Sequence, residues 1–145
     1  MKVHRIDHVS LNVQDLQAAT SFFVDLGLVV QAEWEMEGEW LDHVLGLTGV
    51  KTACVALGTA DGQTWIELVK YKAPSEEPEI SKPKINTLGI RHLAFVVEDI
   101  DTIVNNLKKK GIELFSEVQQ YQESYKLCFV RGPEGVILEL AQRMT

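Results

Sequence analysis

Cysteine, proline and clustered positive charge are all scarce in this chain of 145 residues. The two cysteines, Cys54 and Cys128, are too few for a disulfide framework and form no CxxC motif, so we expect two buried free thiols. The formal net charge is −7, and the one lysine run, residues 108–110, falls where a helix is expected to end. These scarcities argue against a disulfide-stabilised protein and against a nucleic-acid-binding surface.

Long apolar segments are also missing. No stretch near the first residue resembles a secretory signal, and no apolar run is long enough to span a bilayer. The composition, 46% hydrophobic and 24% charged, is typical of a globular protein. We therefore expect a cytoplasmic protein with a small-molecule substrate and no membrane or nucleic-acid partner.

What the chain does contain is a repeat of itself. The segments "RIDHVSLNVQDLQ" (5–17) and "GIRHLAFVVEDID" (89–101) align so that His8 matches His92, 84 residues later. Each copy alternates like a strand with one apolar face, then has an aspartate that can cap a helix, an apolar helical stripe and a stop glycine. The repeat predicts an internal duplication.

Each half is predicted to have the order β-α-β-β-β, which gives an α+β fold of two βαβββ modules. We assign residues 1–72 to the first module, 73–88 to a linker and 89–145 to the second module. The strands expected after the first of each half are 28–34, 49–57, 64–71, 112–118, 125–131 and 136–142.

The closing strand of each half carries a glutamate between two large aliphatic residues, in "IEL" (66–68) and "LEL" (138–140). Successive strand residues face opposite sides of a sheet, so packing of the aliphatic side chains under a helix turns Glu67 and Glu139 to the other face. The same alternation places the histidine from the first strand of each half on that face.

Four potential metal ligands thus occupy matched positions of the duplication: His8, Glu67, His92 and Glu139. A single strand histidine or glutamate is more often a hydrogen-bonded or solvent-facing residue, but four such coincidences favour a metal site. Two imidazoles and two carboxylates suit one divalent ion (Zn, Ni, Co, Mn or Fe) with open coordination positions. Such an ion is a Lewis acid that can hold two adjacent substrate oxygens and stabilise an enediolate-like charge.

These segments, with "WIELVKY" (65–71) and "RGPEGVILEL" (131–140), resemble the vicinal oxygen chelate superfamily, also called the glyoxalase/bleomycin-resistance/dioxygenase fold. The resemblance implies a cupped mixed sheet around a metal, with the same four ligands. It also implies a homodimer, in which the site lies within one chain or across two.

The complete ligand set is similar to that of glyoxalase I and of methylmalonyl-CoA epimerase. It implies a metal-dependent lyase or isomerase that acts on a small oxygenated substrate through an enediolate-like intermediate. The alternatives are an Fe(II) extradiol-type dioxygenase and a metal-free antibiotic-binding protein. The chain departs from both closer relatives: Ser10 and Asn12 stand where glyoxalase I has its glutathione-binding arginine, and Thr52 stands where the epimerase has a catalytic glutamate. We therefore expect the ligands Glu67 and Glu139 to be the catalytic bases.

Residues 32–47 match nothing in the other half. They suggest either a lid carrying Trp40 over the site or, as we favour, a short amphipathic helix that buries Trp40, Val44 and Leu47 on the sheet.

Other polar and aromatic residues are weaker candidates. His43 is expected to be an exposed histidine. Tyr121 and Tyr125 are equally consistent with a roof over the site and with a surface loop. Strand alternation directs Arg91 away from the metal, whereas Arg131 lines the pocket only if its loop folds inward.

Overall fold

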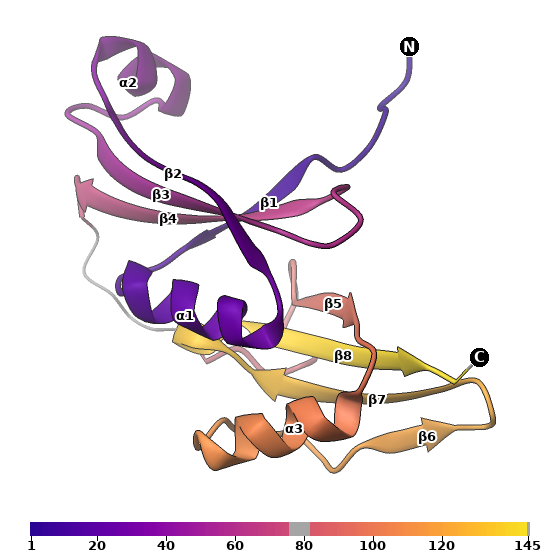
Figure 1. The fold of residues 1–145 in the computed structure, drawn as a ribbon. Helices are drawn as coiled ribbons and strands as arrows, with labels where there is room; N and C mark the ends of the chain where they lie inside the picture. Colours follow the sequence, from indigo (N-terminus) through magenta and orange to yellow (C-terminus); the bar gives the residue numbers. More distant parts are fainter. Residues whose placement is uncertain (76–81, 145) are drawn as a thin grey trace. The chain divides into compact units, whose positions relative to one another are not determined.

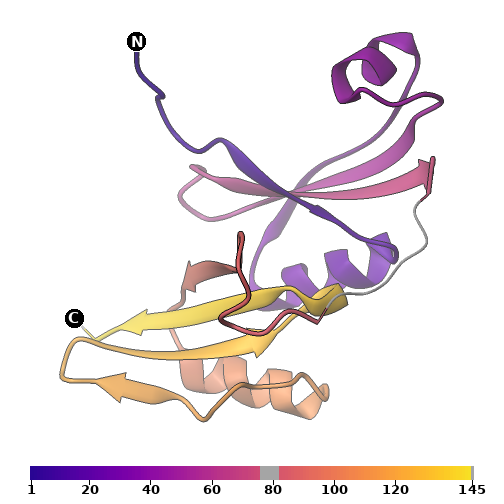
Figure 2. The same ribbon diagram turned by 180° about the vertical axis from the view of Figure 1, so that it is seen from behind.

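The computed structural model describes residues 1–75 and 82–144, and the chain forms two compact units, Met1–Glu79 and Ile80–Thr145 (Figure 1). Each unit is a four-stranded mixed sheet with a helix against one face, and the same layering is visible from behind (Figure 2). The predicted α+β class is therefore confirmed. Within the described residues, no helix has both the length and the apolar character needed to cross a membrane.

In the first unit the sheet has the strand order β1-β4-β3-β2. Strand β1 is parallel to β4, and the other neighbours are antiparallel. The elements are β1 (His8–Asn12), α1 (Leu16–Leu26), β2 (Val29–Glu37), α2 (Glu39–Leu45), β3 (Lys51–Gly58) and β4 (Trp65–Ala73).

Helix α1 begins and ends as its sequence predicts. The Asp15 carboxylate accepts a hydrogen bond from the amide of Ala18 (2.9 Å), and Gly27 ends the helix with φ of 119°, a left-handed value that favours glycine. The buried stripe of α1 packs on β3 and β4, where Leu57 and Leu68 are fully buried. The buried helix residues are Ala19, Phe23 and Leu26.

The second unit repeats this plan with the strand order β5-β8-β7-β6 and with β5 parallel to β8. Its elements are β5 (His92–Val96), α3 (Ile100–Lys109), β6 (Gln119–Tyr121), β7 (Tyr125–Arg131), a 3₁₀ turn (Pro133–Gly135) and β8 (Ile137–Arg143). Asp99 caps α3 by accepting from the amide of Thr102 (3.1 Å). Two lysines occupy the last turn of α3, as expected from the helix dipole.

The two modules share one register between the first and last strands. In each module the histidine lies opposite the residue two positions before the glutamate: His8 lies opposite Trp65, and His92 lies opposite Ile137. Because side chains alternate along a strand, the histidine and the glutamate of each module face the same side of the sheet, opposite the helix. The duplication is therefore present in the backbone pairing as well as in the sequence.

The prediction for residues 32–47 is wrong about which residues are buried. A short helix, α2, is present, but Trp40, Val44 and Leu47 are exposed, at 68%, 60% and 45% of their surface. Gly46 ends the helix in the left-handed region, so Leu47 lies outside it and does not continue the stripe.

The loop after α2 explains this orientation. The Asp42 carboxylate accepts hydrogen bonds from the backbone amides of Gly49 (2.9 Å) and Val50 (2.8 Å), which folds the loop back onto the helix. Leu41 and Val50 are the buried apolar residues of this region. The hydrogen bonds from the loop thus turn Leu41 inward and the predicted stripe outward.

The strand predicted over 112–118 is too long, since backbone hydrogen bonds join it to β7 only at Glu113 and Phe115. Only Leu114 forms a bridge there, with Val130, and the paired strand β6 comes later, at Gln119–Tyr121. The Ser116 hydroxyl donates to the carbonyl of Glu117 (2.9 Å) at a bend in the chain. A side chain that bonds its own backbone competes with strand pairing, and the segment is split as a result.

The predicted linker, 73–88, includes residues 76–81, which lie outside the described residues. On one side of them β4 runs through Ala73. On the other, the Pro83 carbonyl accepts a hydrogen bond from Arg131 of β7 (2.9 Å), which attaches this part of the chain to the second unit.

Candidate metal-binding residues in each module

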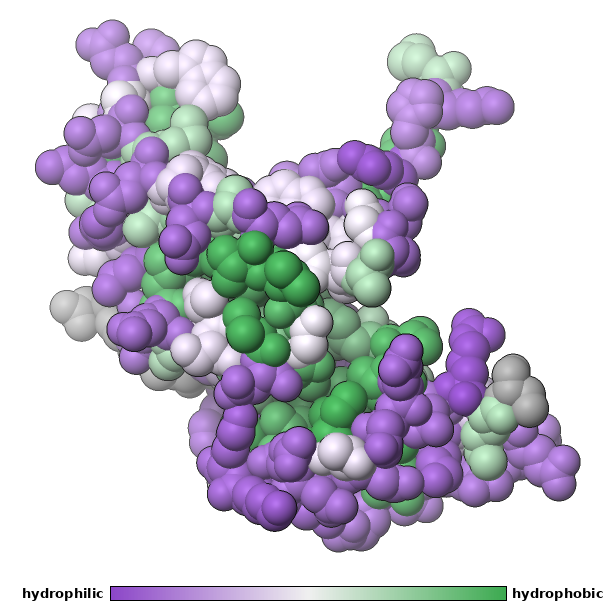
Figure 3. All heavy atoms as spheres, viewed as in Figure 1, coloured by the Kyte–Doolittle hydropathy of each residue, from purple (hydrophilic) through white to green (hydrophobic). Residues whose placement is uncertain are grey.

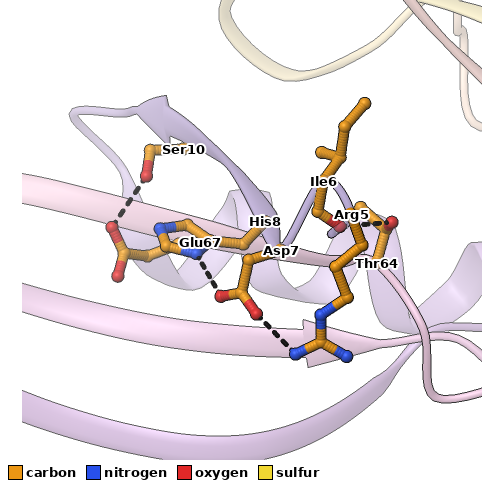
Figure 4. Close-up of polar contacts among 7 residues, drawn as sticks. All are labelled: Arg5, Ile6, Asp7, His8, Ser10, Thr64 and Glu67. Carbon is orange, nitrogen blue, oxygen red and sulfur yellow. Dashed lines mark hydrogen bonds and ion pairs between the residues drawn. The ribbon is translucent and has the colours of Figure 1, made fainter. Parts of the chain in front are cut away.

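In the first module, His8 and Glu67 extend from the neighbouring strands β1 and β4 (Figure 4). Ser10, which lies opposite Glu67 in the register, donates its hydroxyl to Glu67 Oε1 at 2.8 Å. This hydrogen bond holds one oxygen of the carboxylate. Glu67 is half-buried at the sheet surface, so its charge keeps contact with solvent.

The His8 ring has a carboxylate partner of its own. Its Nδ1 lies 2.9 Å from Asp7 Oδ2, and the Arg5 guanidinium donates to the other oxygen of Asp7 at 2.7 Å (Figure 4). The pKa of Asp7 lies below its ordinary value, chiefly because of the hydrogen bond with His8, with Arg5 adding to the effect. Asp7 Oδ2 is therefore positioned to accept a hydrogen bond from an Nδ1–H group of His8.

Aromatic rings complete the surroundings of His8. Trp65 stacks on the imidazole, with ring centroids 4.3 Å apart and planes inclined by 26°. Trp34 of β2 meets Trp65 edge-on at 6.5 Å. The histidine is thus fixed by a ring on its face and a carboxylate on its edge.

In the second module the histidine and glutamate contact each other directly. His92 Nε2 lies 3.2 Å from Glu139 Oε2, and the Phe129 ring meets the imidazole edge-on at 5.1 Å. Ala94 lies opposite Glu139, so no hydroxyl is available there to hold the carboxylate. Thus Nε2 of His92 faces its glutamate, whereas the carboxylate contact of His8 is made by Nδ1 with Asp7.

The histidine and glutamate side chains are suitable ligands for a divalent ion, but one module alone has too few of them. Imidazole nitrogen and carboxylate oxygen are common ligands of transition metals. Across residues 1–75 and 82–144, no group of three or more histidine, cysteine, aspartate and glutamate side chains is positioned to hold a metal. Each module therefore supplies two donors, and a complete coordination shell requires more than one such pair.

The two thiols are set apart from this chemistry. Cys54 and Cys128 are both buried and free, as predicted. Burial raises the pKa of Cys128 to about 11, and burial together with the nearby Glu67 charge raises the pKa of Cys54. Both remain neutral thiols at physiological pH.

The weaker candidates occupy ordinary structural positions. His43 is exposed, as expected. Arg131 donates to Glu113 (3.2 Å), Pro83 and Gly135 and lies over the Phe115 ring, so its hydrogen bonds are made within the second unit.

The remaining candidates are likewise engaged in local contacts. Arg91 donates to the carbonyls of Thr87 and Leu88. Tyr121 and Tyr125 lie on β6 and β7 with ring centroids 5.5 Å apart.

Two neighbours of the candidate ligands were not predicted from the sequence. Asp7 directly precedes His8, and this adjacency was the available signal for a carboxylate–imidazole pair. Ser10 falls on the correct face by alternation, but its pairing with Glu67 depends on the register between β1 and β4, which the sequence does not display.

Apolar surface gathers elsewhere on the first module. Figure 3 shows hydrophobic side chains over α1 and β2, and the exposed apolar residues of these elements include Val24, Val29 and Val30. This patch lies on other residues than the histidine and glutamate pair.

Two βαβββ modules, each with one histidine and one glutamate on the sheet face opposite its helix, define the structural class. The sequence pattern of the Glyoxalase/Bleomycin resistance protein/Dioxygenase superfamily matches residues 5–140, and the chain belongs to that superfamily. The resemblance found in the sequence is confirmed. Members of this superfamily bind small molecules, and many use a divalent metal.

Individual relatives agree with this assignment. The crystal structure of a glyoxalase family protein from Bacillus cereus is similar, with a TM-score of 0.94 and 39% identity over 100% of this chain and 97% of that one. The uncharacterised protein YaeR of Escherichia coli is 28% identical over 143 residues, 96% of each chain. The mitochondrial methylmalonyl-CoA epimerase of Mus musculus is 29% identical over 147 residues, covering 97% of this chain and 74% of the epimerase.

Proposed function

We propose that the protein is a divalent-metal-dependent lyase or isomerase that acts on a small oxygenated substrate. The observation that supports this proposal is the duplicated histidine–glutamate pair, which has the same register in both modules. One pair is a weak ligand set, whereas two pairs provide two imidazoles and two carboxylates. His8, Glu67, His92 and Glu139 would hold one ion (Zn, Ni, Co, Mn or Fe), within one chain or across a homodimer.

The glutamates would also carry the proton transfer. A bound divalent ion supplies Lewis acidity toward adjacent substrate oxygens. Glu67 or Glu139 would act as the base that removes a proton from the carbon beside the carbonyl, and the other glutamate, in its protonated carboxylic acid form, would return one. Ser10 holds Glu67 at 2.8 Å and so fixes one of these carboxylates.

The relatives support this reaction class. A mouse relative is named as an epimerase, and isomerisation of that kind requires removal and return of a proton beside a carbonyl group. A small-molecule substrate, a homodimer and a cytoplasmic location belong to the same proposal.

The deciding experiment is metal analysis of the untagged protein by elemental spectrometry, before and after reconstitution. We expect one divalent ion per chain, lost in the His8→Ala, His92→Ala double variant because half of the ligands are gone. The matched control is His43→Ala, which removes an exposed histidine of α2 and leaves the metal in place. A wild-type protein that stays metal-free after reconstitution would refute the proposal.

Activity assays then separate the competing functions. Proton transfer in thiohemiacetals of 2-oxoaldehydes or in acyl-CoA epimers supports a lyase or isomerase. Oxygen uptake with catechols in the iron-loaded protein identifies an extradiol-type dioxygenase instead. Tight binding of an apolar compound without metal identifies a sequestering protein.

A further inference from the structure

His8 is restrained in a way that its counterpart His92 is not. The carboxylate of Asp7 lies 2.9 Å from His8 Nδ1, and Arg5 holds the second oxygen of that carboxylate at 2.7 Å. An ionised aspartate can only accept hydrogen bonds, so this contact favours a proton on Nδ1, and in the neutral ring the lone pair is then on Nε2. The hydrogen bond therefore selects one tautomer of His8.

Trp65 restrains the same ring in a different direction. It lies opposite His8 in the register and stacks on the imidazole at 4.3 Å. Stacking limits tilting of the ring, while the bond to Asp7 limits its rotation. Among the residues that the structure describes, none forms a hydrogen bond with Nε2 of His8.

The second module shows which nitrogen faces its glutamate. There Nε2 of His92 contacts Glu139 at 3.2 Å. The position that matches Asp7 is Arg91, whose guanidinium donates to backbone carbonyls and offers no acceptor to an imidazole. The carboxylate support is thus specific to the first module.

We propose that Asp7 is a positioning residue that, with Trp65 against the ring face, fixes His8 as the Nδ1–H tautomer and presents Nε2 to a metal ion. The proposal rests on the metal-dependent function proposed above. A carboxylate on the remote nitrogen also raises the basicity of the coordinating one, and loss of such a partner lowers metal affinity by about 10–100-fold in other proteins. Asp7 itself touches neither metal nor substrate.

The first test needs no metal. Nitrogen-15 NMR of histidine-labelled, metal-free protein at about pH 8.5, where imidazole is neutral, reports the tautomer of each ring. His8 resonances are assigned with a His8→Gln variant. We expect the Nδ1–H form in the wild type, a shift toward the Nε2–H form in Asp7→Ala, and retention of Nδ1–H in Asp7→Asn, whose amide oxygen can still accept the hydrogen bond from Nδ1–H.

The second test titrates Zn²⁺ against a chelating dye. We expect Asp7→Ala to bind Zn²⁺ about 10–100-fold more weakly than the wild type, with Asp7→Asn between them. Glu35→Gln is the matched control: it removes an exposed carboxylate of the same module, one paired with Lys72, and we expect no change in affinity.

The two readouts keep the two proposals apart. A tautomer or a Zn²⁺ affinity that is unchanged in Asp7→Ala overturns the positioning role. A wild-type protein that binds none of Zn²⁺, Ni²⁺, Co²⁺, Mn²⁺ and Fe²⁺ overturns the proposed function, and it does so whatever the NMR result for Asp7.

Discussion

The two modules have the same backbone plan and the same histidine–glutamate pair, but they surround that pair differently. In the first module Ser10 bonds Glu67 and Asp7 bonds His8. At the matched positions the second module has Ala94 and Arg91, and its histidine contacts its glutamate directly. The fold therefore requires neither the serine nor the aspartate. The histidine and glutamate of the first module are held by neighbouring side chains, whereas those of the second module contact each other.

The largest effect is expected from truncating the leucine that follows the glutamate, and it tests whether the stability of both modules depends equally on this residue. Leu68 and Leu140 occupy this matched position, and both are fully buried. Truncation to alanine should lower the free energy of unfolding by about 2–5 kcal/mol in either variant, because each leaves a cavity beneath a helix. Urea unfolding followed by circular dichroism measures the loss.

Val24→Ala is the control for this pair, since Val24 lies exposed on α1. Its effect should stay within about 0.5 kcal/mol. A loss below about 1 kcal/mol in Leu68→Ala or Leu140→Ala would contradict the equivalence of the two cores.

A smaller effect is expected from exchanging the residues opposite the glutamates. Ser10→Ala removes the hydroxyl that bonds Glu67 and should weaken Zn²⁺ binding about tenfold, the lower end of the range for partners of metal ligands. The reciprocal change, Ala94→Ser, should not weaken it. Equal affinities in wild type and Ser10→Ala, measured by dye competition, would show that the serine does not support the site.

The smallest effect concerns the helix caps. Asp99 accepts from the amide and the hydroxyl of Thr102, and these hydrogen bonds hold the pKa of Asp99 below the ordinary 3.8. A carboxyl group with a lowered folded-state pKa contributes stability above its unfolded-state pKa, and this contribution is lost as the pH falls through the folded-state pKa. In Asp99→Asn the free energy of unfolding should therefore decrease less steeply at acid pH than in the wild type.

Thr102→Ala makes the cap of α3 resemble that of α1, because the residue that matches Thr102 in the first module is Ala18. It should remove part of the pH dependence of the free energy of unfolding, because the hydroxyl hydrogen bond is lost while the hydrogen bond from the backbone amide to Asp99 remains. Urea midpoints between about pH 6 and about pH 3 test both variants. If the urea midpoint of Asp99→Asn falls with pH as steeply as that of the wild type, the pH dependence arises from other groups.

Local patterns in the sequence were enough for most of the fold. The alternation around His8 and His92, the capping aspartates and the stop glycine after α1 each act within a few residues of the chain, so the strands and helices that depend on them were predicted correctly. The faces of Glu67 and Glu139 followed from the same alternation.

The errors in the fold arose where hydrogen bonds between side chains and the backbone override the pattern of apolar residues. The stripe of Trp40, Val44 and Leu47 has helical spacing, but the bonds from Asp42 to the loop at Gly49 and Val50 select a different buried face. The contact between Ser10 and Glu67 was missed for a different reason, since it joins residues 57 positions apart and depends on the register of two strands.

The buried cysteines have a practical consequence. The chain carries one shielded thiol in each module, Cys54 beside the face of Glu67 and Cys128 within the second sheet, and burial suppresses the thiolate form of both. An alkylating reagent reaches either sulfur only when its own half of the protein opens. The alkylation rates of Cys54 and Cys128 therefore report how often the structure around each thiol opens.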